Sequence, residues 1–176
     1  MPSVGDDTGN KLLYFAYGSN MLSKRLRAPS RTPSALFLDT GFVEGRKLTF
    51  DKLSSDGSGK CDIESTGNPS DKVYGVLYEI IQSEKTALDK AEGLGKGYEE
   101  QAVAVITPSG PHKAIAYVGT SKKPDLKPFH WYKELVVAGA IEHLLPEEYV
   151  QNIRAVESKP DTNTERCREQ RELLKG

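Results

Sequence analysis

The stretch YFAYGSN, residues 14–20, joins a run of aromatic residues to a turn sequence. The chain from Leu12 to Tyr17 is continuously apolar or aromatic and stops at Gly18, which is typical of a buried strand. Gly18-Ser19-Asn20 has the composition of an ordinary turn. A second interpretation is that its backbone N–H groups face an anion or oxyanion, with Gly18 allowing close approach. A helix starting at Asn20 or Met21 would add the positive end of its dipole.

Composition narrows the class of protein. The 176 residues suit one domain, with 37% hydrophobic and 28% charged residues. A formal net charge of -1 argues against phosphate-backbone binding, so we expect no nucleic-acid partner. No window holds the ~18 apolar residues of a membrane span. Cys61 and Cys167 lack metal-ligand spacing, and the N-terminus has no leader pattern, so we expect reduced thiols and a cytoplasmic chain.

The order of the predicted elements indicates the fold class. Residues 1–10 are expected to be a disordered tail, 11–160 a single domain, and 161–176 a charged helix or tail. Strands are predicted at 12–17, 35–38, 46–50, 72–80, 101–107 and 113–118, with loops at 54–60 and 108–111 and a linker at 121–128. Strands come first and helices late. The sequence therefore predicts an α+β fold with a mixed, barrel-like β-sheet flanked by helices.

Helices are predicted from periodicity and from capping residues. A short helical turn is expected at 21–27, with Ser19 or Asn20 as its N-cap, and a helix at 84–92, with Ser83 as its N-cap and Gly93 ending it. After residue 128 a long helix carries a buried stripe, and Pro146 begins the next helix. The stripe consists of Tyr132, Leu135, Val136, Gly139, Ala140 and His143.

Glu92 is the main catalytic candidate. Leu88, Ala91 and Glu92 share one face of the short helix, so the carboxyl is expected to point toward the core. Glu92 also lies in the last turn, where the negative end of the dipole disfavours an anion. Both features would make the side chain a better proton acceptor than a solvated carboxylate, as a general base requires. The alternative is a solvated glutamate in a helix that favours glutamate.

The remaining polar candidates carry less information. Tyr132 begins the long helix and either lines a pocket or is an ordinary core tyrosine. His143 is interpreted as a packing or surface histidine. No histidine pairs by spacing with Cys61 or Cys167, so a cysteine–histidine hydrolase has no support. Gly93-x-Gly95-x-Gly97 follows a helix, not a strand, which excludes a dinucleotide fingerprint.

Two segments together resemble the γ-glutamylcyclotransferase family, which includes AIG2-like proteins. These are LYFAYGSNM at 13–21 and LDKAEG at 88–93, followed by Gly97-Tyr98. The segment that opens with Trp131-Tyr132-Lys133 is similar to the C-terminal part of the same family. The similarity extends over residues 12–156 and is greater to the larger γ-glutamylcyclotransferases than to ChaC-type glutathione enzymes.

The resemblance implies a fold, a reaction and a set of site residues. It implies a compact mixed barrel and release of 5-oxoproline from a small γ-glutamyl substrate by intramolecular aminolysis, with no metal or organic cofactor. Some relatives suggest a homodimer. Glu92 matches the catalytic acid/base, and Tyr132 matches a tyrosine bordering the substrate. The loop that holds the glutamyl group matches Tyr14, Phe15, Ala16, Tyr17, Gly18, Ser19 and Asn20.

The sequence leaves the leaving group open. Glu99-Glu100 adds two acidic residues near the expected entrance, and Arg25 or Arg46 are the candidates to bind the substrate α-carboxylate unless backbone amides do so. Within enzymes, the alternatives to γ-glutamyl amino acids are γ-glutamylamines and γ-glutamyl protecting groups in a biosynthetic pathway. An alternative of another class is a non-catalytic small-ligand-binding module.

Overall fold

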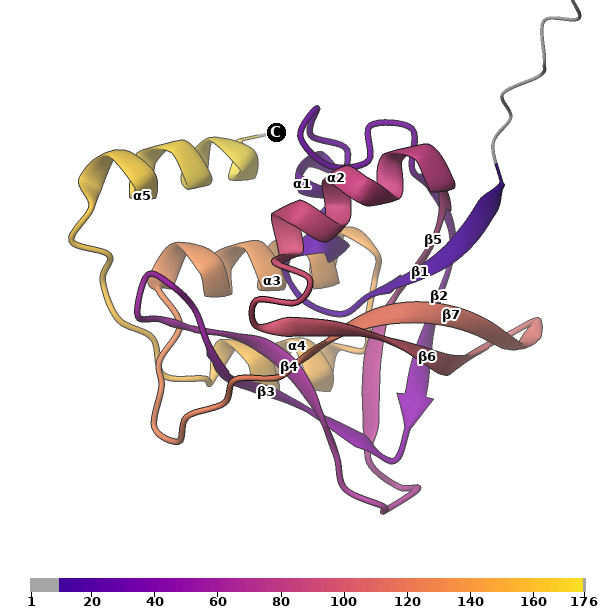
Figure 1. Cartoon of the computed structure of the whole chain (residues 1–176). Helices are drawn as coiled ribbons and strands as arrows, with labels where there is room; N and C mark the ends of the chain where they lie inside the picture. The colour runs from indigo at the N-terminus through magenta and orange to yellow at the C-terminus, as the bar shows by residue number, and fades with distance from the viewer. Residues whose placement is uncertain (1–9, 176) are drawn as a thin grey trace, which may run out of the picture.

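A computed structural model describes residues 10–175, and its centre is a closed five-stranded barrel (Figure 1). Strand β1 pairs antiparallel with β5 along its whole length, and the barrel closes where Tyr14 of β1 pairs in parallel with Ile115 of β7. The predicted mixed, barrel-like sheet is therefore confirmed. In spatial order the strands are β1 (Lys11–Ala16), β5 (Lys72–Ile81), β2 (Leu36–Glu44), β6 (Tyr98–Thr107) and β7 (Gly110–Gly119).

A separate hairpin and five helices surround the barrel. Strands β3 (Arg46–Leu53) and β4 (Gly59–Ser65) form the two-stranded hairpin. The helices are α1 (Ser23–Leu26), α2 (Gln82–Glu92), α3 (His130–Glu142), α4 (Glu147–Arg154) and α5 (Thr164–Arg171), with 3-10 turns at Ser19–Met21 and Glu172–Leu174. Figure 1 shows α3, α4 and α5 on one side of the barrel and α1 and α2 across one end. None of the helices among residues 10–175 is long and apolar enough to cross a membrane.

Helix α3 packs against the end of the turn that follows β1. Its buried face includes Tyr132, Leu135 and Val136, as the predicted stripe requires. At Gly139 an added Cβ would lie 2.6 Å from the backbone nitrogen of Leu22, so the helix backbone packs directly against the chain just beyond the turn. His143 ends the helix with its Nε2 2.9 Å from the carbonyl oxygen of Met21. It is a packing histidine, and burial lowers its pKa.

Four local predictions need correction. The loop predicted at 54–60 is shorter, because Gly59 and Lys60 already belong to β4, and the loop predicted at 108–111 is shorter, because Gly110 and Pro111 already belong to β7. Helix α2 begins at Gln82 with Ile81 in the N-cap position, so Ser83 is not the cap. The capping predicted for Ser19 or Asn20 is also wrong. Gly18 is the N-cap of the 3-10 turn and Leu22 is the N-cap of α1, and no side chain makes a capping hydrogen bond at either position.

The C-terminal segment forms a helix that packs on the domain. Asp161 is buried and accepts hydrogen bonds from Trp131 Nε1 at 2.8 Å and from Arg166 Nε at 2.7 Å. Arg171 of α5 pairs with Glu134 of α3 at 3.1 Å. Within the segment 161–176, for which a charged helix or tail is predicted, α5 spans Thr164–Arg171 and a 3-10 turn spans Glu172–Leu174. The predicted tail at 1–10 lies outside the described residues except for Asn10.

Candidate functional site

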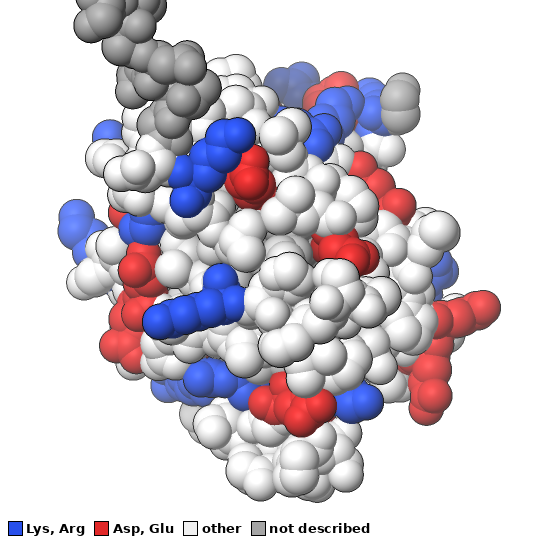
Figure 2. Space-filling view, turned by 90° about the vertical axis from the view of Figure 1, so that its right-hand side faces the viewer, with Lys and Arg blue, Asp and Glu red and all other residues white. Residues whose placement is uncertain are grey.

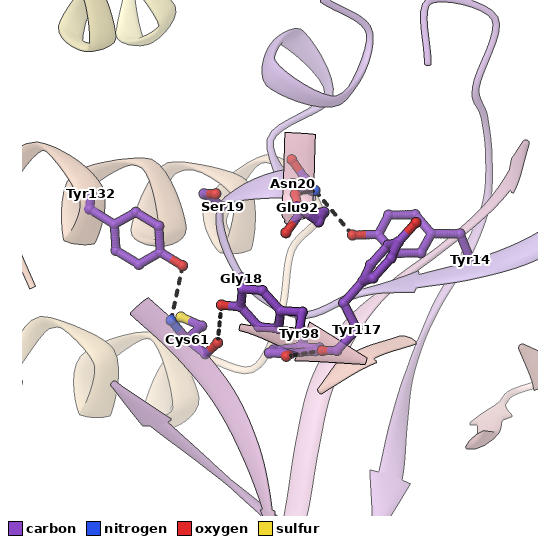
Figure 3. Close-up of a pocket in the computed structure, with 10 residues that line it drawn as sticks. Tyr14, Gly18, Ser19, Asn20, Cys61, Glu92, Tyr98, Tyr117 and Tyr132 are labelled. Carbon is purple, nitrogen blue, oxygen red and sulfur yellow. Dashed lines mark hydrogen bonds between the residues drawn. The ribbon is translucent and has the colours of Figure 1, made fainter. Parts of the chain in front are cut away.

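A cavity opens where the turn after β1 meets the end of α2. It is small and partly open to solvent, and Figure 3 shows the side chains that line it. Strands β1, β4, β6 and β7, helices α2 and α3 and the turn itself all contribute residues. The lining consists of Tyr14, Tyr17, Gly18, Ser19, Asn20, Cys61, Glu92, Tyr98, Tyr117 and Tyr132.

Glu92 and Asn20 are joined by a short hydrogen bond. Asn20 Nδ2 lies 2.6 Å from Glu92 Oε1 and also 3.1 Å from the Tyr14 hydroxyl, to which it donates. Glu92 is the last residue of α2, and Gly93 ends the helix in the left-handed conformation with φ 72°. Asn20 therefore fixes the half-buried carboxylate at the cavity. Leu88 is fully buried but Ala91 is exposed, so the predicted apolar face of α2 extends to Leu88 and not to Ala91.

The turn brings backbone amides to the same cavity. Met21 N donates to Gly18 O and Leu22 N to Ser19 O, whereas among residues 10–175 no backbone carbonyl accepts from the amides of Ser19 or Asn20. An added Cβ at Gly18 would lie 3.1 Å from Cys61 Cβ and 3.4 Å from the Tyr132 hydroxyl. Glycine thus leaves room beside these two residues. The predicted short helix consists of the 3-10 turn Ser19–Met21 and the four-residue α1, Ser23–Leu26, so Ser19 and Asn20 lie within the 3-10 turn and not at the start of an α-helix.

Four of the cavity tyrosines are held by hydrogen bonds to residues distant in the chain. Tyr17 donates to the carbonyl of Tyr117, and the Tyr98 hydroxyl donates to Cys61 O at 2.7 Å. Cys61 N donates to the Tyr132 hydroxyl at 3.0 Å. The Tyr117 hydroxyl donates to Asp89 Oδ1 at 2.5 Å. These bonds fix the walls of the cavity before any ligand enters.

Burial keeps the cavity hydroxyls and the thiol in their neutral forms. Burial, and then the charge of Glu92, raises the pKa of Tyr14 far above its usual value. Burial likewise raises the pKa values of Tyr17, Tyr98 and Tyr132. It raises the pKa of Cys61 to about 12, so this thiol is not a nucleophile at neutral pH. Among the described residues, Glu92 contributes the one carboxyl group of the cavity lining.

The predicted site residues divide into two groups. Tyr14, Tyr17, Gly18, Ser19, Asn20, Glu92 and Tyr132 all line the cavity. Phe15 and Ala16 do not line it; both are buried in the core, where Phe15 packs 6.3 Å from the ring of Tyr17. Because side chains alternate along a strand, Phe15 points away from the side that Tyr14 faces.

The two candidate arginines lie in different places. Arg25 lines a second, outer pocket that adjoins the cavity and shares Glu92 with it. Arg46 instead donates to Ile63 O at 3.1 Å and to Gln101 Oε1 at 2.9 Å, away from both pockets. Glu99 and Glu100 are exposed and line neither pocket.

Sequence reasoning missed three cavity residues, Cys61, Tyr98 and Tyr117. Each comes from a different strand, so no local spacing connects them. The available signal was weak: Tyr98 follows the Gly-rich segment after Glu92, and Tyr117 lies in a predicted strand. Among residues 10–175 no three His, Cys, Asp or Glu side chains gather as metal ligands would.

The comparisons with known proteins agree on one family. A family model described as "AIG2-like family" matches residues 72–153. The chain is 32% identical to the γ-glutamylcyclotransferase of Bos taurus over 157 residues, which cover 85% of this chain and 80% of the relative. It is 32% identical to that of Homo sapiens over 153 residues, with 82% and 78% covered.

A solved structure gives the same result for the fold. A γ-glutamyl cyclotransferase superposes with a TM-score of 0.82 at 31% identity, covering 95% of this chain and 100% of that one. From identity, coverage and superposition together, this chain belongs to the γ-glutamylcyclotransferase family.

Proposed function

We propose that this protein releases 5-oxoproline and a free amino acid from γ-glutamyl amino acids by intramolecular aminolysis. The observation that carries the proposal is the position of Glu92. Its carboxylate, held 2.6 Å from Asn20 Nδ2, lines the same cavity as the turn amides. A proton acceptor and oxyanion donors on one small cavity are what attack by an amine on an amide carbonyl requires.

Glu92 transfers the proton in this mechanism. The α-ammonium of the γ-glutamyl group is not a nucleophile until it loses a proton, which Glu92 accepts. The free amine attacks the γ-carbonyl, forming the C–N bond of the five-membered ring. The C–N bond to the leaving amine then breaks, and Glu92 returns the proton to the departing nitrogen. The ring nitrogen carries a second proton after the attack, and the same carboxylate passes it to the leaving amine, which gives the lactam N–H and a free ammonium without consuming water or an oxidant.

The turn stabilises the oxyanion that forms on the γ-carbonyl oxygen. The amides of Ser19 and Asn20, which have no backbone acceptor among the described residues, are the donors in this proposal. The hydrogen-bonded tyrosines restrict the glutamyl chain to a folded conformation, which matters because ring closure depends on positioning. The neutral hydroxyls of Tyr14 and Tyr132, which accept hydrogen bonds from Asn20 and from Cys61 N, can donate their own protons to the substrate.

The test is formation of 5-oxoproline. Purified protein is expected to convert γ-glutamyl-alanine to 5-oxoproline, and Glu92→Gln to lower kcat at least ~10²-fold while keeping the fold. Glu147→Gln, at an exposed position in the first turn of α4, is the matched control and should keep full activity. Wild-type turnover in Glu92→Gln would sink the mechanism.

The substrate panel separates the remaining alternatives. Faster turnover of γ-glutamylamines than of γ-glutamyl amino acids would favour the amine-specific activity. Absence of 5-oxoproline from every γ-glutamyl amino acid, amine and glutathione would favour a binding module. The proposal also includes a cytoplasmic location and a homodimer. The free thiols of Cys61 and Cys167 support a reducing compartment, and the exposed Leu36, Phe37 and Leu38 of β2 support self-association, which sedimentation would measure.

A further inference from the structure

A second pocket lies directly outside the cavity and is strongly basic. This outer pocket is larger than the cavity, is partly open to solvent, and shares Ser19, Glu92, Tyr98 and Tyr132 with it. Its basic lining residues are Arg25, Arg31, Lys52, Lys60, Lys90 and Lys96. Glu92 is the single acidic residue in its lining. Because the chain as a whole has a net charge of -1, these cations are a local concentration.

The charge distribution elsewhere makes the contrast clear. On the face shown in Figure 2, Lys and Arg alternate with Asp and Glu, and no basic patch forms there. Within the outer pocket, Lys60 is paired with Asp56 at 3.6 Å. The other five cations have no ion pair among residues 10–175. Such unpaired positive charges on one concave surface attract anions.

The arginines have unused hydrogen-bond donors. Arg25 Nη1 donates to the neutral side chain of Gln170 at 2.7 Å. The Nε atoms of Arg25 and Arg31 are buried, and neither finds an acceptor among the described residues. A buried donor without an acceptor is costly, and a bound carboxylate would satisfy it.

Burial also affects the lysines. Lys52 is 8% exposed, and its ammonium lies 4.4 Å from the centre of the Tyr98 ring. Burial lowers the pKa of Lys52, while Glu92 acts in the opposite direction. Burial lowers the pKa of Lys60 to about 8. A second anion in the pocket would favour the charged form of both lysines and so offset their desolvation penalty.

Because Glu92 lines both pockets, the glutamyl group and the leaving group of a substrate can occupy one pocket each. If the glutamyl group fills the cavity beside the turn amides, the leaving nitrogen lies at Glu92, on the boundary between the pockets. The remainder of the leaving group then extends into the outer pocket. Its α-carboxylate would engage one or two of the cations, and the rest would remain without an anion.

We propose that the outer pocket receives the leaving group and selects leaving amino acids with an acidic side chain. This inference rests on the proposed function and names its substrate class. The second carboxylate forms charge-assisted hydrogen bonds with cations that the first leaves free. A neutral side chain of the same shape would leave those cations unpaired.

Isosteric substrate pairs test the proposal on the wild-type protein. We expect kcat/KM for γ-glutamyl-glutamate to exceed that for γ-glutamyl-glutamine by at least about tenfold, the effect of one charge-assisted hydrogen bond. γ-Glutamyl-aspartate and γ-glutamyl-asparagine should differ in the same direction. The preference should shrink as salt is raised, because ions screen the attraction.

Variants then connect the preference to the pocket. Arg31→Gln and Lys52→Gln are expected to lower the ratio of kcat/KM for the glutamate and glutamine substrates severalfold. Lys96→Gln, at an exposed position, should lower the ratio less and carries little risk to the fold. Lys123→Gln is the matched control, because Lys123 is exposed and lies outside the lining. It should leave the ratio unchanged.

Each result has a separate meaning. Equal kcat/KM within both isosteric pairs overturns this inference and leaves the proposed function standing. Equal losses for acidic and neutral substrates in Arg31→Gln and Lys52→Gln also overturn it, and assign the cations to the glutamyl carboxylate. Absence of 5-oxoproline from every substrate overturns the proposed function, and this inference with it.

Discussion

Replacing Asn20 by alanine tests whether the turn positions the proposed base. The substitution removes the donor that lies 2.6 Å from Glu92 Oε1. It also removes the hydrogen bond that Asn20 donates to the buried Tyr14 hydroxyl, whereas Asn20 Oδ1 is buried without a hydrogen-bond partner among the described residues. Asn20→Ala is therefore expected to free the Glu92 carboxylate while keeping the fold.

The magnitude follows from the strength of that bond. A hydrogen bond to a charged group contributes about 1.5–3 kcal/mol. If it is used in the transition state to orient the carboxylate, its loss lowers kcat roughly 10- to 100-fold. KM should change much less, because the side chain acts on Glu92 and not on the substrate. Asn20→Asp should be worse than alanine, since it places a second carboxylate against the first.

The assay is 5-oxoproline release from γ-glutamyl-alanine over a range of substrate concentrations, so that kcat and KM are separated. Circular dichroism and thermal unfolding establish that each variant is folded. Asn152→Ala, at an exposed position on α4, is the control and should match wild type. A folded Asn20→Ala variant with wild-type kcat, or one whose entire loss lies in KM, would refute the positioning role.

Two further substitutions test the packing of the site and of the C-terminal helix. In Gly18→Ala the new Cβ would lie 3.1 Å from Cys61 Cβ and 3.4 Å from the Tyr132 hydroxyl. This contact should displace the substrate and lower kcat/KM about tenfold. An unchanged kcat/KM would contradict the packing. Asp161→Asn should destabilise the fold by about 2–3 kcal/mol at neutral pH, as measured by urea unfolding. Arg166 holds the pKa of Asp161 well below its usual range, so the stabilisation is complete above pH ~4 and is lost as the pH falls further. The difference between wild type and Asp161→Asn should therefore shrink on acidification; a constant difference down to pH 2 would contradict it.

The sequence predicted the elements whose signals are local. The apolar run 12–17 became β1 at Lys11–Ala16, Gly93 ends α2, and the stripe on α3 is buried. Hydrophobic periodicity and a left-handed glycine are properties of a few neighbouring residues, so they can be read from one chain. The resemblance to a family added the link between the turn and Glu92.

The features that the sequence did not predict depend on strand pairing and on contacts between segments that are remote in the chain. Strand β4 has weak apolar character, and it is recognisable mainly because Gly59–Ser65 pairs with β3. Tyr98 and Tyr117 reach the cavity through the register of β6 with β7 and through barrel closure. The hydrogen bond from the Asn20 side chain to Glu92 also joins two remote segments. Alternation within β1 does explain why Tyr14 lines the cavity and Phe15 does not.

The way the barrel closes has a consequence for its motions. Strand β5 pairs with β1 and, apart from a register shift between Phe37 and Asp39, with β2, and β6 pairs with β7 along its whole length. Among the described residues, these two halves are joined in register at Tyr14–Ile115 and Phe42–Ile106 alone. The cavity straddles the first of these seams, with Tyr14 and the turn on one side and Tyr98 and Tyr117 on the other. Breathing along this seam would widen the cavity without unfolding either half. Amide hydrogens beside the seam should therefore exchange with solvent sooner than those inside each half.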